Sequence, residues 1–185
     1  MVKGKGKKKD WFVIVAPKMF GEKEIGKAMV SDPGSLMGRR VVLNLAELTN
    51  NFAKYYMKFA FRIKRIEGNR AFSEFDGSEC LRDYISRMVL RRVKRIDAIQ
   101  DLQTKDGIRI RVKSLMIASR RMKSSIEKKM RREIEEMIKK EVESSTLEDF
   151  VKKIINDKIK NKVLKEARKI YPVRNFEIRR TEVLQ

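Results

Sequence analysis

The chain has 185 residues and a net charge of +21, because 46 lysines and arginines stand against 25 aspartates and glutamates. With one cysteine and no histidine, it lacks the residues for a disulfide framework, a cysteine-clustered zinc site and imidazole-based catalysis or metal binding. No apolar run approaches the ~18 residues that a membrane span needs, and no secretory signal is evident, so we expect an intracellular protein whose charge is matched by a polyanion.

The first ten residues, MVKGKGKKKD, contain five lysines and almost no apolar side chain. Such a segment cannot bury enough surface to order itself, so we expect residues 1–10 to form a disordered basic tail. The tail is either a solubilising segment or an arm that binds nucleic acid. Its candidate RNA-binding residues are Lys3, Lys5, Lys7, Lys8 and Lys9.

Residues 11–121 are expected to be rich in strands. The apolar run WFVIVAPKMF is stopped by Pro17, SDPGS is a turn signal, and RRVVLNLAEL is expected to form a strand that begins with Arg39 and Arg40. Residues 55–64 then alternate strictly: Tyr55, Met57, Phe59, Phe61 and Ile63 share one face, and the cations Lys58, Arg62 and Lys64 lie on the other. This pattern is typical of a half-buried strand with a cationic outer face.

The next stretch, SECLRDYISRMVLRR, predicts a helix that Ser78 caps and on which Cys80 is a small buried residue. Two strands then flank a hairpin signal, Lys105-Asp106-Gly107. In the second strand Ile108, Ile110 and Val112 alternate with Arg109, Arg111 and Lys113.

From Ser124 the apolar period becomes helical, so residues 122–171 are expected to be helical, with Ser145 or Thr146 capping a second helix. Pro172 ends the last helix, and residues 173–184 predict a closing strand. The whole pattern favours an α+β fold in which residues 11–185 form one RNA-binding domain. We expect an antiparallel sheet curled into a barrel-like core with packed C-terminal helices.

The positive charge is concentrated: residues 105–132 hold 11 basic and two acidic residues, whereas residues 133–170 hold ten basic and nine acidic residues. The outward faces of the two alternating strands show cations and no anion. Neighbouring like charges repel across strands, so we infer that phosphates balance them. The run Arg120, Arg121 and Lys123 extends the same candidate surface.

Four aromatic residues could stack on unpaired bases, although most lie on apolar faces and core packing is their more frequent role: Trp11, Tyr55, Tyr56 and Phe72. A metal-dependent nuclease would need clustered carboxylates, because two-metal nucleases bind their ions with several of them in one pocket. Asp76, Glu79 and Asp83 lie close together where the helix is expected to begin, and acids there ordinarily face the helix dipole. We therefore predict no catalytic residue, metal or cofactor.

Several segments in a fixed order resemble one family: KKDWFVIVAPKMF, IGKAMV, GRRVVLNLAEL, TKDGIRIRV, KKMRREIEEMIKKEVESSTLEDFVKKII and ARKIYPVRNFEIRRTEVL. The chain resembles the archaeal and eukaryotic small-subunit ribosomal protein of the S-three-a type, also called eukaryotic-type S-one, from about Lys8 to Leu184. It stops soon after TEVL, as in the archaeal short form. The family has no small set of functional residues to transfer, so the candidate sites rest on charge patterning.

The resemblance implies a non-enzymatic component of the small ribosomal subunit, bound to ribosomal RNA and neighbouring proteins on the platform, near the exit of messenger RNA. The expected protein is cytoplasmic and ribosome-bound, and it has no membrane or small-molecule partner; direct contact with messenger RNA is left open. Two alternatives also stay open: a free-standing RNA chaperone or non-specific nucleic-acid-binding protein, and a metal-dependent phosphoryl-transfer enzyme.

Overall fold

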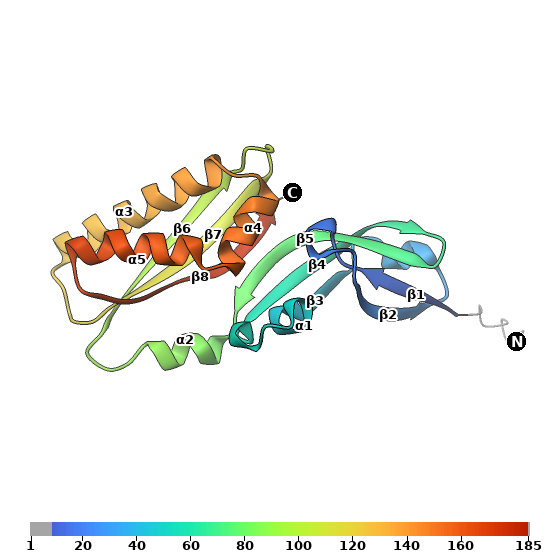
Figure 1. Cartoon of the computed structure of the whole chain (residues 1–185), viewed down its shortest axis with the longest axis horizontal. Helices are drawn as coiled ribbons and strands as arrows, with labels where there is room; N and C mark the ends of the chain where they lie inside the picture. The colour runs from blue at the N-terminus through green and yellow to red at the C-terminus, as the bar shows by residue number, and fades with distance from the viewer. Residues whose placement is uncertain (1–8, 185) are drawn as a thin grey trace, which may run out of the picture. The chain divides into compact units, whose positions relative to one another are not determined.

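The computed structural model describes residues 9–184, so the lysines of the tail other than Lys9 lie outside the described residues. The chain divides into two compact units, which we call unit 1 and unit 2; the first ends at Asp76 and the second begins at Gly77 (Figure 1). The single domain expected for residues 11–185 stays a prediction.

Unit 1 is made of strands, one short helix and three single turns of 3-10 helix. Its strands are β1 (Asp10–Val15), β2 (Glu24–Val30), β3 (Arg40–Asn44), β4 (Met57–Glu67) and the first part of β5 (Arg70–Cys80), and its helix is α1 (Leu45–Thr49). Strand β1 pairs antiparallel with β2 and parallel with β5, while β3 pairs antiparallel with β4. Apolar side chains from these strands form a core: Phe12, Ile14, Val30, Leu36, Ile63 and Ala71.

The alternation predicted for β4 is confirmed. Met57, Phe59, Phe61 and Ile63 are buried, whereas Lys58 and Lys64 are exposed. Tyr55 precedes the strand and is 48% exposed, so it does not continue the apolar face.

The helix predicted to begin at Ser78 starts later, because β5 continues through Cys80 and α2 spans Arg82–Met88. Ser78 is therefore no helix cap: its amide and hydroxyl both bond to the Thr181 hydroxyl, at 3.0 and 2.8 Å. Gly77 explains why the strand can reach this partner. A Cβ at this glycine would lie 2.2 Å from the Thr181 carbonyl oxygen, so only glycine permits the close approach. Cys80 is buried as expected, but at the end of a strand.

Unit 2 packs helices on a sheet. Its elements are the end of β5, α2, β6 (Lys94–Gln103), β7 (Arg109–Ala118), α3 (Ser124–Glu143), α4 (Leu147–Ile155), α5 (Lys158–Ile170) and β8 (Val173–Leu184). Strand β7 lies between β6 and β8 and is antiparallel to both. The predicted hairpin signal joins β6 to β7, and Gly107 has the positive φ, 78°, that this turn requires. Helices α3 and α5 lie along the sheet (Figure 1).

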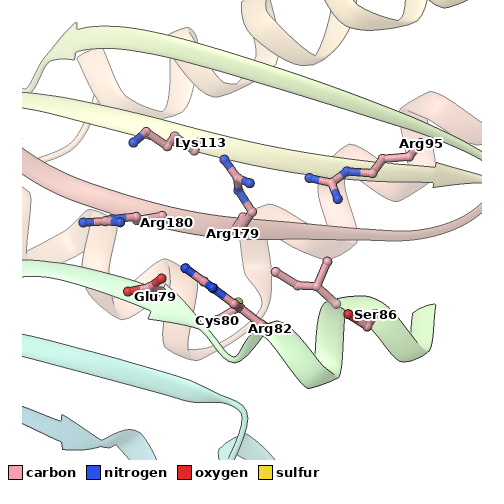
Figure 2. A pocket seen from close by; sticks show the side chains of 9 residues that line it. Glu79, Cys80, Arg82, Ser86, Arg95, Lys113, Arg179 and Arg180 are labelled. Atoms are coloured by element: carbon pink, nitrogen blue, oxygen red, sulfur yellow. The ribbon is translucent and has the colours of Figure 1, made fainter. Parts of the chain in front are cut away.

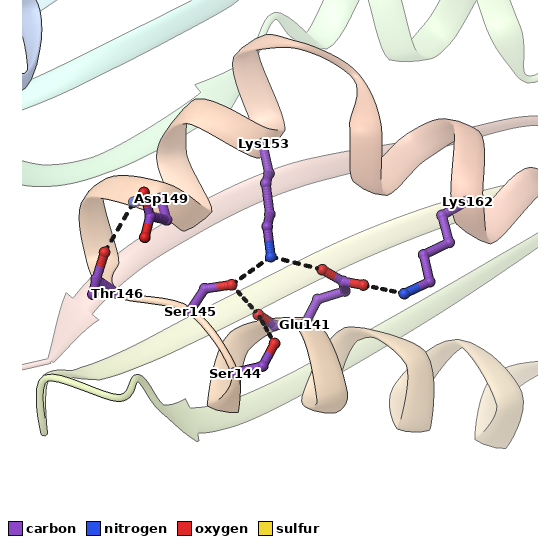
Figure 3. Close-up of polar contacts among 7 residues, drawn as sticks. All are labelled: Glu141, Ser144, Ser145, Thr146, Asp149, Lys153 and Lys162. Carbon is purple, nitrogen blue, oxygen red and sulfur yellow. Dashed lines mark hydrogen bonds and ion pairs between the residues drawn. The ribbon is translucent and has the colours of Figure 1, made fainter.

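The three C-terminal helices are tied together by polar contacts (Figure 3). The predicted cap of α4 is confirmed, since the Thr146 hydroxyl accepts a hydrogen bond from the Asp149 amide at 3.2 Å. On α3, Glu141 accepts from Lys153 of α4 at 3.0 Å and from Lys162 of α5. One carboxylate thus joins three helices, and its two lysine partners lower the pKa of Glu141, with the Lys162 hydrogen bond as the main cause.

The α+β class is confirmed, but the barrel-like core is not supported. Hydrogen bonds link the strands in the order β2-β1-β5-β8-β7-β6, with β4 pairing with β5 and β3 with β4 off this path. The sheet has free ends and is not closed. It is also mixed and not purely antiparallel, because β1 and β5 are parallel. Within residues 9–184, no helix is both long and apolar enough to cross a lipid bilayer.

Candidate nucleic-acid interface

The cationic face of unit 1 contains a carboxylate that the strand pattern did not reveal. Arg40 on β3 and Arg62 on β4 are register partners and lie opposite one another. Between them Asp76 of β5, buried to 9% exposure, binds both arginines: its carboxylate oxygens lie 2.9 Å from Arg40 Nε and 3.0 Å from Arg62 Nε. Two of the candidate cations are therefore held by one acid, while Arg39, Lys58 and Lys64 are exposed.

The cationic face of β7 in unit 2 is balanced in the same way. Arg111 makes two hydrogen bonds to Asp101 on β6, at 2.6 and 2.7 Å, and Lys113 pairs with Glu182 on β8 at 3.2 Å. Asp101 is the register partner of Arg111 across the β6–β7 hairpin. Of the three predicted cations on this face, only Arg109 has no ion pair with a described residue.

The Arg111–Asp101 contact is an ion pair that shifts the pKa of both partners. The hydrogen bond from Arg111 is the main cause that lowers the pKa of Asp101, and the same bond raises the pKa of Arg111. A phosphate that approached Arg111 would compete with this carboxylate. Acids on neighbouring strands thus already balance Arg40, Arg62, Arg111 and Lys113, which the alternation within one strand did not show. Phosphate contact at the strand cations stays a prediction.

The run after β7 lies in a different environment. Arg120, Arg121 and Lys123 are exposed, and Arg120 and Arg121 line a pocket with Ser119 and Arg92. Arg92 belongs to the loop between α2 and β6. Residues 71–104 hold six basic and six acidic residues, so charge patterning alone does not single out Arg92.

Strand register explains why these two loops meet. Lys94, the first residue of β6, pairs with Ala118, the last residue of β7, so the loops before β6 and after β7 leave the sheet at the same end. The Ser119 amide bonds to the Pro172 carbonyl at 3.0 Å, and the Tyr171 hydroxyl donates to the Arg121 carbonyl at 2.8 Å. The second loop is therefore anchored while its arginine side chains stay at the surface.

We call this group of five exposed residues the basic end; it consists of Arg91, Arg92, Arg120, Arg121 and Lys123. None of the five side chains has an ion pair or hydrogen bond with any residue in the described part of the chain. The two loop segments, 89–93 and 119–123, contain no acidic residue. Unpaired arginines and lysines on adjacent loops are suited to bind the phosphates of a nucleic acid.

The aromatic candidates divide between surface and core. Trp11 is 59% exposed, so it is not the core residue that is the more frequent role of such an aromatic side chain. Its register partner Met29 is exposed as well. Tyr55 is exposed as well, whereas Tyr56 is buried. Phe72 is half-buried, and the guanidinium carbon of Arg65 lies over its ring, 4.7 Å from the ring centroid of Phe72.

The three acids considered as candidates for a two-metal nuclease site, Asp76, Glu79 and Asp83, do not form such a site. Asp76 and Glu79 lie on β5 and not in the first turn of a helix, and only Asp83 lies in the first turn of α2. Among residues 9–184, no group of three or more histidine, cysteine, aspartate or glutamate side chains could hold a metal ion.

Comparison with known proteins gives one consistent family. A family model described as the Ribosomal S3Ae family matches residues 1–185. The small ribosomal subunit protein eS1 of Methanothermobacter thermautotrophicus is 40% identical over 179 residues, which cover 97% of this chain and 92% of the relative. The protein of the same name from Sulfurisphaera tokodaii is 37% identical over 184 residues, or 100% of this chain and 95% of the relative.

A third relative named small ribosomal subunit protein eS1, from Methanopyrus kandleri, is 35% identical over 189 residues, covering 100% of this chain and 90% of its own. The family is structural and non-enzymatic, so the prediction that the chain is not an enzyme is confirmed. The resemblance inferred from the sequence motifs is confirmed as well: the chain belongs to the ribosomal S3Ae family, as an archaeal eS1-type ribosomal protein.

Proposed function

We propose that the chain is a structural component of the small ribosomal subunit that binds ribosomal RNA on the platform, near the messenger RNA exit, and supports translation. It would act in the cytoplasm, bound to the ribosome, with ribosomal RNA and neighbouring small-subunit proteins as its partners. The observation that carries the ribosomal role is the 40% identity to an archaeal eS1 protein over 97% of the chain. The platform location rests on the family resemblance alone.

RNA binding is supported by the charge of the chain and by the geometry of its exposed cations. A protein with a net charge of +21 repels itself unless a polyanion neutralises it. The basic end supplies five exposed cations that have no acidic partner within residues 9–184, and phosphates can approach these residues at the lowest electrostatic cost.

The remaining candidate RNA-binding residues that the structure describes fall into two groups. Exposed cations without an acidic partner among the described residues should contact phosphates directly; they are Lys9, Arg39, Lys58, Lys64 and Arg109. The cations that the structure pairs with acids should contribute less, because a phosphate must compete with a carboxylate; they are Arg40, Arg62, Arg111 and Lys113. The tail lysines Lys3 to Lys8 remain proposed contacts from the sequence.

Sedimentation of a cell lysate through a sucrose gradient tests the proposal. The chain should travel with the small subunit at low salt and be partly stripped at high salt, because phosphate contacts weaken as salt rises. A chain that stays at the top of the gradient at low salt would contradict the ribosomal role. A free-standing RNA chaperone would then be the better explanation.

A further inference from the structure

A second basic site lies in unit 2, apart from the basic end. It is a pocket of about 400 Å³ whose lining residues come from the end of β5, α2, β6, β7 and β8 (Figure 2). Five of them are cations: Arg82, Arg95, Lys113, Arg179 and Arg180. Only Lys113 was a candidate from the sequence; Arg82, Arg95 and the adjacent pair Arg179 and Arg180 lie far apart along the chain.

One wall of the pocket contains a bulge in β8. Lys113 of β7 pairs with Arg180, but the next residue, Ser114, pairs with Ile178, so Arg179 is an extra residue in β8. Neighbouring side chains of a regular strand point to opposite faces of the sheet. A bulge removes this alternation and re-aims a side chain, and here both Arg179 and Arg180 line the same pocket.

Helix α2 forms the opposite wall and is held in place by polar contacts to β8. The Tyr84 hydroxyl donates to the buried Glu177 carboxylate at 2.9 Å, and Asn175 donates to the Met88 sulfur. Arg82 and Ser86 of this helix line the pocket, and Figure 2 shows the Arg82 side chain extending away from the helix. The walls are therefore preformed elements of secondary structure.

The charges of the pocket are only partly balanced. Arg95 pairs with Asp97 at 2.8 Å, and Lys113 and Arg180 share Glu182, at 3.2 and 2.6 Å. Glu79 is the one acid in the lining itself. Five cations thus face three carboxylates, which leaves two positive charges in surplus. Arg82 and Arg179 have no ion pair or hydrogen bond with a described residue.

We propose that this pocket binds a phosphodiester group of RNA, with the Arg82 and Arg179 guanidinium groups making the direct contacts. A planar guanidinium binds phosphate oxygens in a bidentate manner, and the surplus charge accommodates an anion. The volume lies in the range of ligand sites, so it admits a phosphate with its attached ribose. This site deepens the proposed function and rests on it.

The test compares the full-length wild-type protein with R82Q/R179Q, which removes both unpaired charges without adding bulk. A matched control, K128Q/K165Q, removes the same charge from exposed lysines of α3 and α5. Binding to a small-subunit ribosomal RNA transcript should weaken about tenfold in R82Q/R179Q and less than threefold in the control. E79Q, which removes the acid from the lining, should strengthen binding about twofold.

A second measurement identifies the ligand by the NMR signals of the arginine Nε–H groups of isotope-labelled protein. A short oligouridylate should shift the Arg82 and Arg179 signals at concentrations at which uridine monophosphate and inorganic phosphate do not. If uridine monophosphate or inorganic phosphate binds as tightly as the oligonucleotide, the pocket is a free-anion site and the RNA assignment is overturned.

The two proposals fail in different ways. If R82Q/R179Q binds the transcript as tightly as K128Q/K165Q while wild-type binding is intact, the pocket is not an RNA site and the proposed function stands. If the wild-type protein neither binds the transcript nor sediments with the small subunit, the proposed function itself fails. A thermal melt of each variant shows whether it has folded, and E79Q gives a result of opposite sign that misfolding cannot imitate.

Discussion

Two regions of unit 2 both carry clustered cations and differ in what surrounds them. On the outer face of β7, Arg111 and Lys113 are paired with acids from β6 and β8. At the basic end, Arg92, Arg120 and Arg121 have no acidic partner among the described residues. The first region stabilises the sheet, and the second is open to a ligand.

Register is the physical reason for the difference. Antiparallel pairing places Asp101 opposite Arg111 at the distance of a direct contact, so the pair forms as the strands form. Loops have no such register, and the basic end contains no acid in either segment. A run of cations therefore signals a binding surface more reliably in a loop than in a strand whose neighbours are unknown.

The largest expected effect is the loss of RNA binding when the basic end is neutralised. The triple variant R92Q/R120Q/R121Q should bind small-subunit ribosomal RNA about a hundredfold more weakly, because three phosphate contacts are lost. The dependence of log affinity on log salt should also become shallower by about two to three, as measured by filter binding over a salt series.

Two further variants make this result specific. K128Q/K140Q/K165Q removes three exposed charges from α3 and α5, and R111Q removes one paired charge from β7. Both should weaken binding less than threefold at the same salt concentration. An equal loss in R92Q/R120Q/R121Q and in K128Q/K140Q/K165Q, which remove the same charge, would show that total charge matters and that the basic end is not a site.

The next effect concerns a buried carboxylate that accepts hydrogen bonds from one tyrosine and one lysine. Glu177 is buried and accepts hydrogen bonds from Tyr84 of α2 and Lys160 of α5. E177A should lower the free energy of unfolding by about 2–3 kcal/mol, because both partners lose their acceptor. Urea denaturation measures this loss. The exposed Glu143 is the control, and E143A should change stability by less than about 0.5 kcal/mol.

A smaller effect depends on pH. The folded protein lowers the pKa of Glu141 below its ordinary value of 4.5, so the ionised form stabilises the fold above that pH. As the pH falls through the lowered pKa, this stabilisation of about 1 kcal/mol should disappear. In E141Q the loss should already be present at neutral pH, and the difference from the wild type should vanish in acid. A constant difference in stability across the pH series would argue against a stabilising role of the Glu141 contacts to Lys153 and Lys162.

The smallest effect is expected when a paired cation on β7 is made unpaired, like those of the basic end. D101N removes the charge that holds Arg111, so a paired strand cation becomes available to a phosphate. RNA affinity should rise about twofold. R111Q placed on D101N should abolish the gain, whereas an unchanged affinity in D101N would mean that β7 does not face RNA.

Elements whose signals are local were predictable from the chain alone. The alternation of β4, the β6–β7 hairpin at Gly107 and the Thr146 cap of α4 follow from side chains a few residues apart. The helix expected from Ser78 was misplaced because a partner distant in sequence, Thr181, extends β5. The closed barrel was not supported because local patterns do not specify which strands end a sheet.

In the candidate site, too, some features follow from the sequence alone and others depend on residues distant in sequence. The sequence by itself determined the excess of cations, the basic run Arg120, Arg121 and Lys123, and the family, since these depend on composition and order alone. Only the tertiary structure decided which cations are neutralised, because Asp76, Asp101 and Glu182 reach them across strands. It also decided which distant arginines meet, because strand register brings Arg92 to Arg120 and a bulge re-aims Arg179 beside Arg180.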